Sequence, residues 1–350
     1  SANQLRHFLG LLKGGRLVDH ATLGATVATS GDGRVVVSDI LESSDAWKRG
    51  LRYDDEIVSL AGRPVRTVNA FKNVLGTLPA GWQVPLMVRR EGRPQRMLVR
   101  LAGIHSAAKL ADLVAGGLEP GPDEGRKAVE KFRLPEVVAD LYEPRPGYAN
   151  HRFNVIERDR VGAALAAHRD TLPPGPWVLA GRLEGGEEFR IELADSLASI
   201  DLPTGSSSLA VDEPFDRNPA PPGSGGLLAA LVVWRRLVTE GPARLGRTAY
   251  WGTAPRDPAA LGDAAAVDLA DVLETSVAGV EARCTVDADG RVLAVDLWTS
   301  PDAEPCEVRF AWDAEAGGPA ALPTRIDVAR GGQAFGRFVV ERPAAGEAAR

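Results

Sequence analysis

The spacing of apolar residues changes along the chain from a helical period to a strand-like period and back. Near the start it predicts a helix over Asn3–Lys13 that ends at Gly14, because glycine is a common helix stop. Two short stretches rich in β-branched residues, Arg34–Leu41 and Glu56–Gly62, then predict strands. Residues Val84–Leu101 form two apolar runs joined by a turn, which is the signal of a hairpin.

A second helix is predicted between these strands, over Thr67–Leu78. Thr67 is suited to cap its first turn, and the apolar residues that follow recur at helical spacing, namely Val68, Phe71, Val74 and Leu75. Strands and helices alternate so closely that Leu23–Leu101 is interpreted as one compact unit.

The region after residue 103 has a different composition. Residues 104–147 are dense in proline, glycine and charge, so we expect a linker with short helices at Lys109–Val114 and Arg126–Phe132. A second domain is expected over residues 148–342, with consecutive antiparallel strands around a buried helix at Leu227–Val238. Residues 343–350 are expected to form a disordered tail.

The expected fold class is therefore α+β, with a curved antiparallel sheet packed on helices in the second domain. A chain of 350 residues is long for a single core, which favours two domains. The net charge of −6 carries no basic block, so nucleic acid is not an expected partner. The longest apolar run, Leu227–Trp234, is too short to span a bilayer, and residues 1–16 do not have the pattern of a signal peptide.

Two cysteines, Cys284 and Cys306, leave two alternatives open. Zinc is excluded because the two thiols and five scattered histidines do not complete a ligand set. The residues are then either two buried thiols or one disulfide between neighbouring strands, which an oxidising compartment would favour. No metal or other cofactor is expected.

One stretch carries a resemblance to a known family. Residues Ser44–Val65, "SDAWKRGLRYDDEIVSLAGRPV", follow the pattern A-x-x-x-G-L-x-x-G-D-x-I-x-x-x-x-G-x-x-V, and "TLGA" at Thr22–Ala25 precedes them. Together with the Thr67–Leu78 helix they resemble a PDZ domain of the bacterial HtrA/DegP type, over residues 16–103. Tyr53 and Asp54 are assigned to the family's Gly-Asp position, as a small departure in the turn.

The resemblance implies a partly closed β-sandwich with two helices and a groove that binds the end of another polypeptide. A turn at Gly24 exposes backbone N–H groups to a terminal carboxylate, and the strand after it offers an open edge. The expected peptide-binding residues are Thr22, Leu23, Gly24, Ala25, Thr26, Val27, Val68, Phe71 and Lys72. Residues 1–15 then resemble the terminal helix of an upstream trypsin-like protease domain.

No catalytic residue is expected in this chain. The nearest match to a serine-protease nucleophile is Ser224 in "PPGSGGLL", which lacks one residue of the G-x-S-G-G context and follows the PDZ region. Ser224 is better interpreted as a cap or loop residue of the buried helix. A hydrolase centred on Ser224 is the least favoured hypothesis.

The second domain vaguely resembles LolA-like half-barrels, in which a sheet curls around a helix. Such a fold would leave a concave apolar face for lipid or another apolar ligand. Four tryptophans are candidates to line that face: Trp177, Trp251, Trp298 and Trp312. The alternative is that they are ordinary core residues, since large aromatics dominate any core.

Two functions therefore compete. The first is the substrate-recognition region of a periplasmic or cell-envelope HtrA-like serine protease in protein quality control, with C-terminal or extended peptide segments and an upstream protease domain as partners. The second is an apolar-ligand carrier that docks through its PDZ module. Homo-oligomerisation is open in both.

Overall fold

The computed structural model describes residues 2–105, 109–110, 141–262, 267–312 and 322–341. The described residues within 1–157 and Trp251–Leu269 form one compact unit, and those within Arg158–Tyr250 and Ala270–Arg350 form another. The predicted division at residues 104–147 assigned Trp251–Leu269 to the second domain, whereas the structure groups this segment with the first unit. The two predicted linker helices and the predicted tail lie largely outside the described residues.

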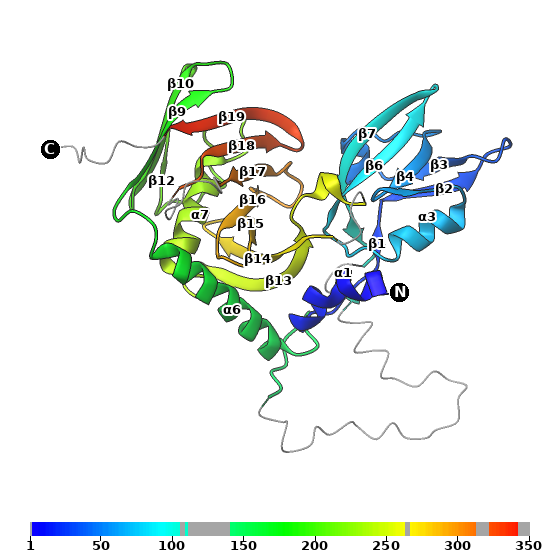
Figure 1. The fold of residues 1–350 in the computed structure, drawn as a ribbon, viewed down its shortest axis with the longest axis horizontal. Coiled ribbons are helices and arrows are strands. Elements are labelled where there is room, and N and C mark those ends of the chain that lie inside the picture. Colours follow the sequence, from blue (N-terminus) through cyan, green and yellow to red (C-terminus); the bar gives the residue numbers. More distant parts are fainter. Residues whose placement is uncertain (1, 106–108, 111–140, 263–266, 313–321, 342–350) are drawn as a thin grey trace. The chain divides into compact units, whose positions relative to one another are not determined.

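The first unit is built on a six-stranded antiparallel sheet (Figure 1). The strand order is β2-β3-β4-β6-β7, with β5 beside β4, and a separate pair joins β1 to β8. The strands are β1 (Ala21–Thr22), β2 (Ala25–Thr29), β3 (Val35–Ile40), β4 (Glu56–Leu60), β5 (Arg63–Pro64), β6 (Gln83–Arg90), β7 (Arg93–Arg100) and β8 (Ala102–Gly103). The helices are α1 (Ala2–Lys13), α2 (Asp45–Lys48) and α3 (Val68–Leu75). The predicted strands, hairpin and helices of this unit are all present.

The β6–β7 hairpin shows how local chemistry sets the register. Arg90 pairs with Arg93, which leaves Glu91 and Gly92 as a two-residue loop. Both loop residues have positive φ, 49° and 78°, as a type I′ turn requires. The register places Val84, Leu86 and Val88 on one face, and all three are fully buried.

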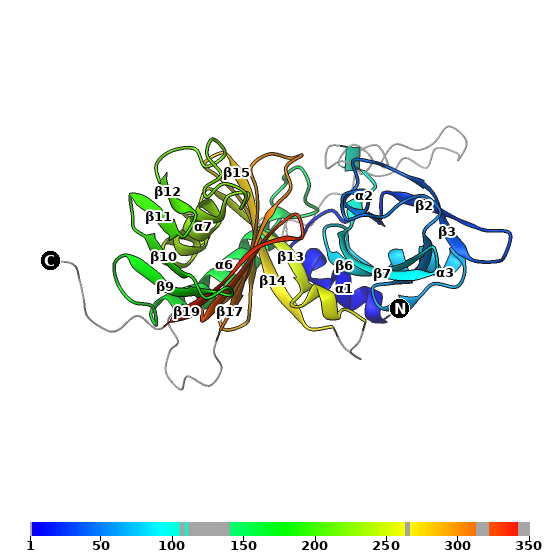
Figure 2. The same ribbon diagram turned by 90° about the horizontal axis from the view of Figure 1, so that it is seen from above.

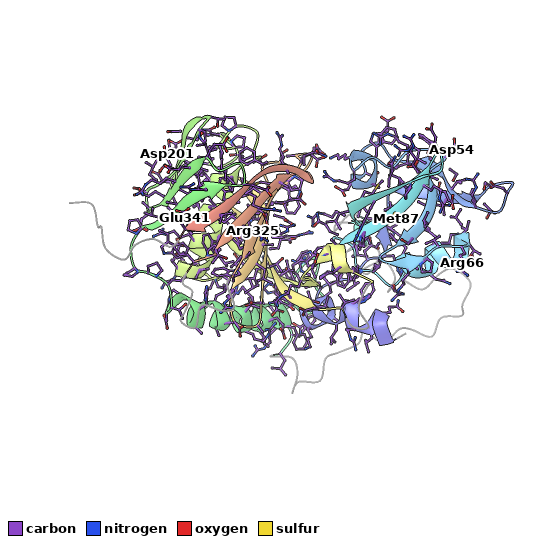
Figure 3. All side chains as sticks on the ribbon, turned by 45° about the horizontal axis from the view of Figure 1, so that its top comes forward. Asp54, Arg66, Met87, Asp201, Arg325 and Glu341 are labelled. Atoms are coloured by element: carbon purple, nitrogen blue, oxygen red, sulfur yellow. The ribbon has the colours of Figure 1, made fainter. Side chains whose placement is uncertain are left out.

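An ion pair with a buried carboxylate anchors the turn before β4. The structure corrects the sequence assignment there by one position. Asp54, labelled in Figure 3, takes the left-handed backbone with φ 63°, and Asp55 is the buried acid, 0% exposed. The Asp55 carboxylate accepts from the Arg52 N–H at 2.8 Å and from the Arg90 Nε at 2.7 Å. The hydrogen bond from Arg90 to this carboxylate raises the pKa of the guanidinium.

Residues Trp251–Leu269 complete the core of the first unit. The indole Nε1 of Trp82, a residue that is 1% exposed, donates to the Thr253 carbonyl at 2.8 Å. Arg96 donates to the Ala259 carbonyl of the short helix η1 (Pro258–Ala260). These contacts join residues about 170 positions apart, which explains why no local pattern predicted them.

The second unit is built on an eleven-stranded antiparallel sheet, in the order β12-β11-β10-β9-β19-β18-β17-β16-β15-β14-β13. Its strands are β9 (Trp177–Leu183), β10 (Glu188–Leu193), β11 (Leu197–Leu202), β12 (Gly205–Ala210), β13 (Arg247–Pro255), β14 (Leu269–Val277), β15 (Val280–Val286), β16 (Val292–Trp298), β17 (Cys306–Ala311), β18 (Arg325–Arg330) and β19 (Gln333–Glu341). Two helices accompany it, α6 (His151–Arg169) and α7 (Leu227–Glu240). The predicted α+β class and the antiparallel sheet on helices are confirmed.

Helix α7 lies within the curve of this sheet (Figure 2) and contacts strands from both halves, β10–β12 and β15–β17. Ten of its fourteen residues are buried, as its nearly continuous apolar sequence predicts. Trp234 of α7 stacks against Trp177 at 5.0 Å and Phe310 at 4.6 Å between ring centroids. An apolar helix therefore packs against both halves of the sheet, on the side that faces the core.

Of the two alternatives for the cysteines, the structure contradicts the disulfide and supports two buried thiols. Cys284 and Cys306 are free, buried thiols on β15 and β17, and β16 lies between those strands. Two strand spacings amount to roughly 9–10 Å, beyond the reach of an S–S bond. Burial raises the pKa of each thiol to about 12, so both are inert in the folded chain.

Across the described ranges, no helix combines the length and the apolar character needed to cross a bilayer.

Candidate peptide-binding site

Strand β2 is the outer strand of the first unit's sheet. It pairs with β3 on one side, and the described residues supply no strand on its other side. An unpaired edge presents backbone donors and acceptors to any extended chain that approaches it. The edge on which the predicted groove depends is therefore open.

The hydrogen-bond pattern shows which groups of β2 face outward. The Leu41 N–H donates to the Gly24 carbonyl at 2.9 Å, next to the pair Ala25–Ile40. In an antiparallel ladder, hydrogen bonds join alternate pairs of facing residues. When the residues just outside a facing pair are bonded to each other in this way, the two residues of that pair exchange no hydrogen bonds. The N–H and carbonyl of Ala25 therefore point away from β3, toward the open edge.

The far end of β2 repeats this arrangement. The Ser30 N–H donates to the Arg34 carbonyl at 2.8 Å, which makes Thr29–Val35 another pair without mutual bonds. The register to β3 shifts between Thr26 and Val27, where β3 holds one extra residue, but the backbone groups of β2 itself still alternate. Val27, two residues from both Ala25 and Thr29, therefore also directs its backbone groups outward. Alternate residues Ala25, Val27 and Thr29 thus direct their backbone groups to the open edge.

The turn before β2 requires glycine at position 24. Gly24 has φ 72°, and a Cβ atom on it would overlap the Cβ of Ser44. Ser44 in turn caps α2, because its side chain accepts from the Trp47 N–H at 3.2 Å. The Gly24 N–H donates to the Thr22 hydroxyl at 3.0 Å. Leu23 lies between Thr22 and Gly24, and the described residues supply no acceptor for its N–H.

Helix α3 lies beside β2 (Figure 1). Its predicted cap is confirmed, since the Thr67 side chain accepts from the Ala70 N–H at 3.0 Å. Phe71 and Val74 are the buried residues of the helix. Val68, Lys72 and Leu75 follow one another at the i, i+4, i+7 spacing that places side chains on one face. Val68 and Leu75 are half-buried on this face and Lys72 is exposed.

The structure brings the predicted binding residues together from two places in the sequence. Thr22 to Val27 are continuous along the turn and β2, and Val68, Phe71 and Lys72 are on the neighbouring helix. Phe71 is only 4% exposed, so its predicted role in contacting a ligand stays a prediction. Leu75 is not among the predicted binding residues, although its spacing of seven positions from Val68 places it on the same half-buried face.

Ser224 has a structural role. Its residue is 0% exposed, and its hydroxyl donates to the Pro221 carbonyl at 2.7 Å. The same oxygen accepts from the N–H groups of Gly226 and Leu227 at the start of α7, each at 3.1 Å. Gly226 occupies the N-cap position of α7, so Ser224 fits the alternative of a loop residue, and its hydroxyl pairs amides at the start of the buried helix. No group of side chains suited to hold a metal ion occurs among the described residues.

The four tryptophans do not form one set. Trp177 is a core residue, 2% exposed, and Trp312 is half-buried against the same core. Trp251 is buried in the first unit, and Trp298 stands outside the core beside the Arg283 guanidinium. Core packing thus accounts for Trp177 and Trp312, and the LolA-like interpretation stays a prediction.

Comparisons with known proteins agree with the first unit's geometry. Residues 21–101 match the family described as PDZ domain. The periplasmic pH-dependent serine endoprotease DegQ of Escherichia coli is 26% identical over 159 residues, which cover 43% of this chain and 34% of DegQ. The periplasmic serine endoprotease DegP of Salmonella typhimurium is 28% identical over 152 residues, which cover 43% of this chain and 32% of DegP.

These matches have a limited extent. The chain spans about a third of the length of the curated relatives it matches. A solved serine endoprotease from Yersinia pestis is 15% identical, covers 30% of this chain and 36% of its own, and has a TM-score of 0.23, which establishes no shared overall fold. The periplasmic names of the relatives agree with the predicted periplasmic or cell-envelope location. This chain is therefore a PDZ-containing protein with HtrA-like sequence, in which residues 21–101 form the PDZ domain.

Proposed function

We propose that the first unit captures the C-terminal ends of other polypeptides between β2 and α3. The observation that carries the proposal is the open edge of β2, where Ala25, Val27 and Thr29 direct backbone groups outward. An extended peptide can extend the sheet there by hydrogen bonds between main chains.

The turn at Thr22–Ala25 supports recognition of a terminal carboxylate. The amides of Leu23 and Ala25 lack acceptors within the described part of the chain, and the left-handed Gly24 between them bends the backbone. Successive amides in such a turn form a concave nest for an anion. The exposed ammonium of Lys72 adds positive charge on the helix side.

The side chains around the edge favour an apolar last residue in the ligand. Val68 and Leu75 are half-buried aliphatic residues on the face of α3 that follows the helical spacing, and Leu23 is 2% exposed beside the turn. Three outward-facing residues on β2 span a ligand of about five residues, because a strand presents its backbone groups to one side at every second position. The expected ligand is a short extended segment with an apolar C-terminus.

Peptides with and without a free terminal carboxylate test this proposal. A fluorescent pentapeptide with an apolar last residue is expected to bind about tenfold more tightly as the free acid than as the amide, because charge-assisted hydrogen bonds to amides are lost in the latter. Methylation of every second peptide nitrogen tests the pairing with β2, since only alternate N–H groups face the strand. Equal affinity of the acid and the amide would contradict the carboxylate turn.

A variant of β2 tests the same backbone pairing by changing the protein instead of the peptide. Val27→Pro removes an N–H that faces outward and leaves the bonds to β3 intact, which edge strands tolerate. It is expected to weaken peptide binding about threefold to tenfold. Val27→Ala shortens the same side chain but keeps the N–H, and separates the two effects. Binding that weakens in Val27→Ala as much as in Val27→Pro would contradict backbone pairing.

We also propose that the chain serves as the substrate-recognition part of an HtrA-like envelope serine endopeptidase. The support is the sequence likeness to DegQ and DegP over the region that holds the groove. The coding sequence upstream of Ser1 tests this, because a trypsin-like domain contains His, Asp and Ser in that order. An upstream region without such a domain would contradict the proposal, whatever the outcome of the peptide titrations.

A further inference from the structure

The hydroxyl of Thr22 occupies the acceptor position at the centre of the carboxylate turn. Its oxygen accepts from the Gly24 N–H at 3.0 Å, a normal hydrogen-bond length. Side chains of Thr often bond the backbone N–H two residues on in this way. Gly24 is a buried residue and the bond itself is partly buried, so the Thr22 hydroxyl pairs an amide that is only partly open to solvent.

A terminal carboxylate would use the same N–H group. An anion in a backbone nest accepts from successive amides, here those of Leu23, Gly24 and Ala25. An oxygen that accepts from Gly24 must lie about 3 Å from its nitrogen, which is where the Thr22 oxygen lies. A carboxylate oxygen can therefore reach the Gly24 amide only if the Thr22 side chain gives up its bond.

We infer that the Thr22 hydroxyl is an internal stand-in for the ligand carboxylate and sets how strongly the groove prefers free C-termini. The inference rests on the proposed peptide-binding function. The hydroxyl keeps the Gly24 amide paired in the empty groove, and a free C-terminus has to displace it. An amidated or internal segment brings no carboxylate and leaves the bond intact. Thr22 thus narrows the difference in affinity between C-termini and internal extended segments.

The substitution Thr22→Val tests the inference, because valine has the shape of threonine without the hydroxyl. In this variant the Gly24 amide is already free, so the free-acid pentapeptide is expected to bind about threefold to tenfold more tightly. The amidated pentapeptide is expected to keep its affinity within about twofold. The measured quantity is the dissociation constant of the amidated peptide divided by that of the free acid, both for the full chain. This ratio is expected to rise in Thr22→Val. Thr22→Ser retains a hydroxyl and is expected to keep the ratio of the unaltered protein.

Hydrogen exchange supplies a readout that does not depend on any peptide. The Gly24 amide is expected to exchange faster in Thr22→Val than in the unaltered protein, because its bond to the side chain is gone. Thr204→Val makes the same chemical change on an exposed turn of the second unit, outside the proposed groove, and is expected to alter neither the ratio nor Gly24 exchange.

Each outcome decides the inference. An unchanged ratio in Thr22→Val would show that the hydroxyl does not compete with the ligand. A lower ratio would show that it donates to the carboxylate, which is the opposite role. If the unaltered protein binds acid and amide equally well, the proposed function itself fails, and the Gly24 exchange result still reports whether the Thr22 bond exists.

Discussion

The bond between Trp82 and Thr253 yields the sharpest prediction about stability. Trp82→Phe keeps an aromatic ring in a site that is 1% exposed but removes the Nε1–H that donates to Thr253 at 2.8 Å. The Thr253 carbonyl left without its donor lowers the free energy of unfolding by about 1–2 kcal/mol. The cavity left by the missing ring atoms lowers it by about 1 kcal/mol more. The expected loss in the free energy of unfolding of the first unit is therefore about 2–3 kcal/mol.

Urea unfolding combined with hydrogen exchange measures this loss. Exchange resolves the first unit separately, which matters because a chain with two units need not unfold in one step. The amides of β4 and β6 are expected to lose protection in Trp82→Phe. Trp298→Phe is the control, since Trp298 stands outside the second unit's core, and its cost is expected to stay below about 1 kcal/mol. A loss below about 0.5 kcal/mol in Trp82→Phe would refute the view that residues 251–269 complete this core.

Three further predictions follow from buried groups. Asp55→Ala is expected to lower the free energy of unfolding of the first unit by about 2–4 kcal/mol, measured with urea. This is somewhat less than for a fully buried ion pair, because the Arg90 side chain is 34% exposed. A loss no larger than that of Asp54→Ala would contradict the prediction. Cys284 and Cys306, with pKa values raised to about 12 by burial, are expected to react with iodoacetamide only after unfolding, and rapid labelling of the native chain seen by mass spectrometry would overturn their placement. Burial also lowers the pKa of His168 below its ordinary 6.5, so the unfolded chain binds a proton that the folded chain does not, and the unfolding free energy is expected to fall as the pH drops below 6.5. His168→Gln should flatten that dependence, and an unchanged slope in the variant would count against it.

The sequence by itself determined the local elements of the first unit. The Thr67 cap, the Glu91–Gly92 turn and the alternating strands were all predictable, because each depends on residues within a few positions of one another. The sequence also predicted that the segment from Thr22 to Val27 and the helix beginning at Val68 lie side by side, because the PDZ pattern fixes both the turn and the helix beside it.

Tertiary structure alone decided the features that join distant parts of the chain. Cys284 and Cys306 lie on strands β15 and β17, and only the sheet order, in which β16 pairs with both strands, decided that the two thiols are apart. Trp82 gave no sign of its partner at Thr253, since one tryptophan in a strand pattern is compatible with any apolar surface. The left-handed backbone at Gly24 is tied to a residue that lies far from it in the sequence, because a Cβ atom there would overlap the Cβ of Ser44. Periodicity records which face of an element is buried, and only the folded chain decides what that face is buried against.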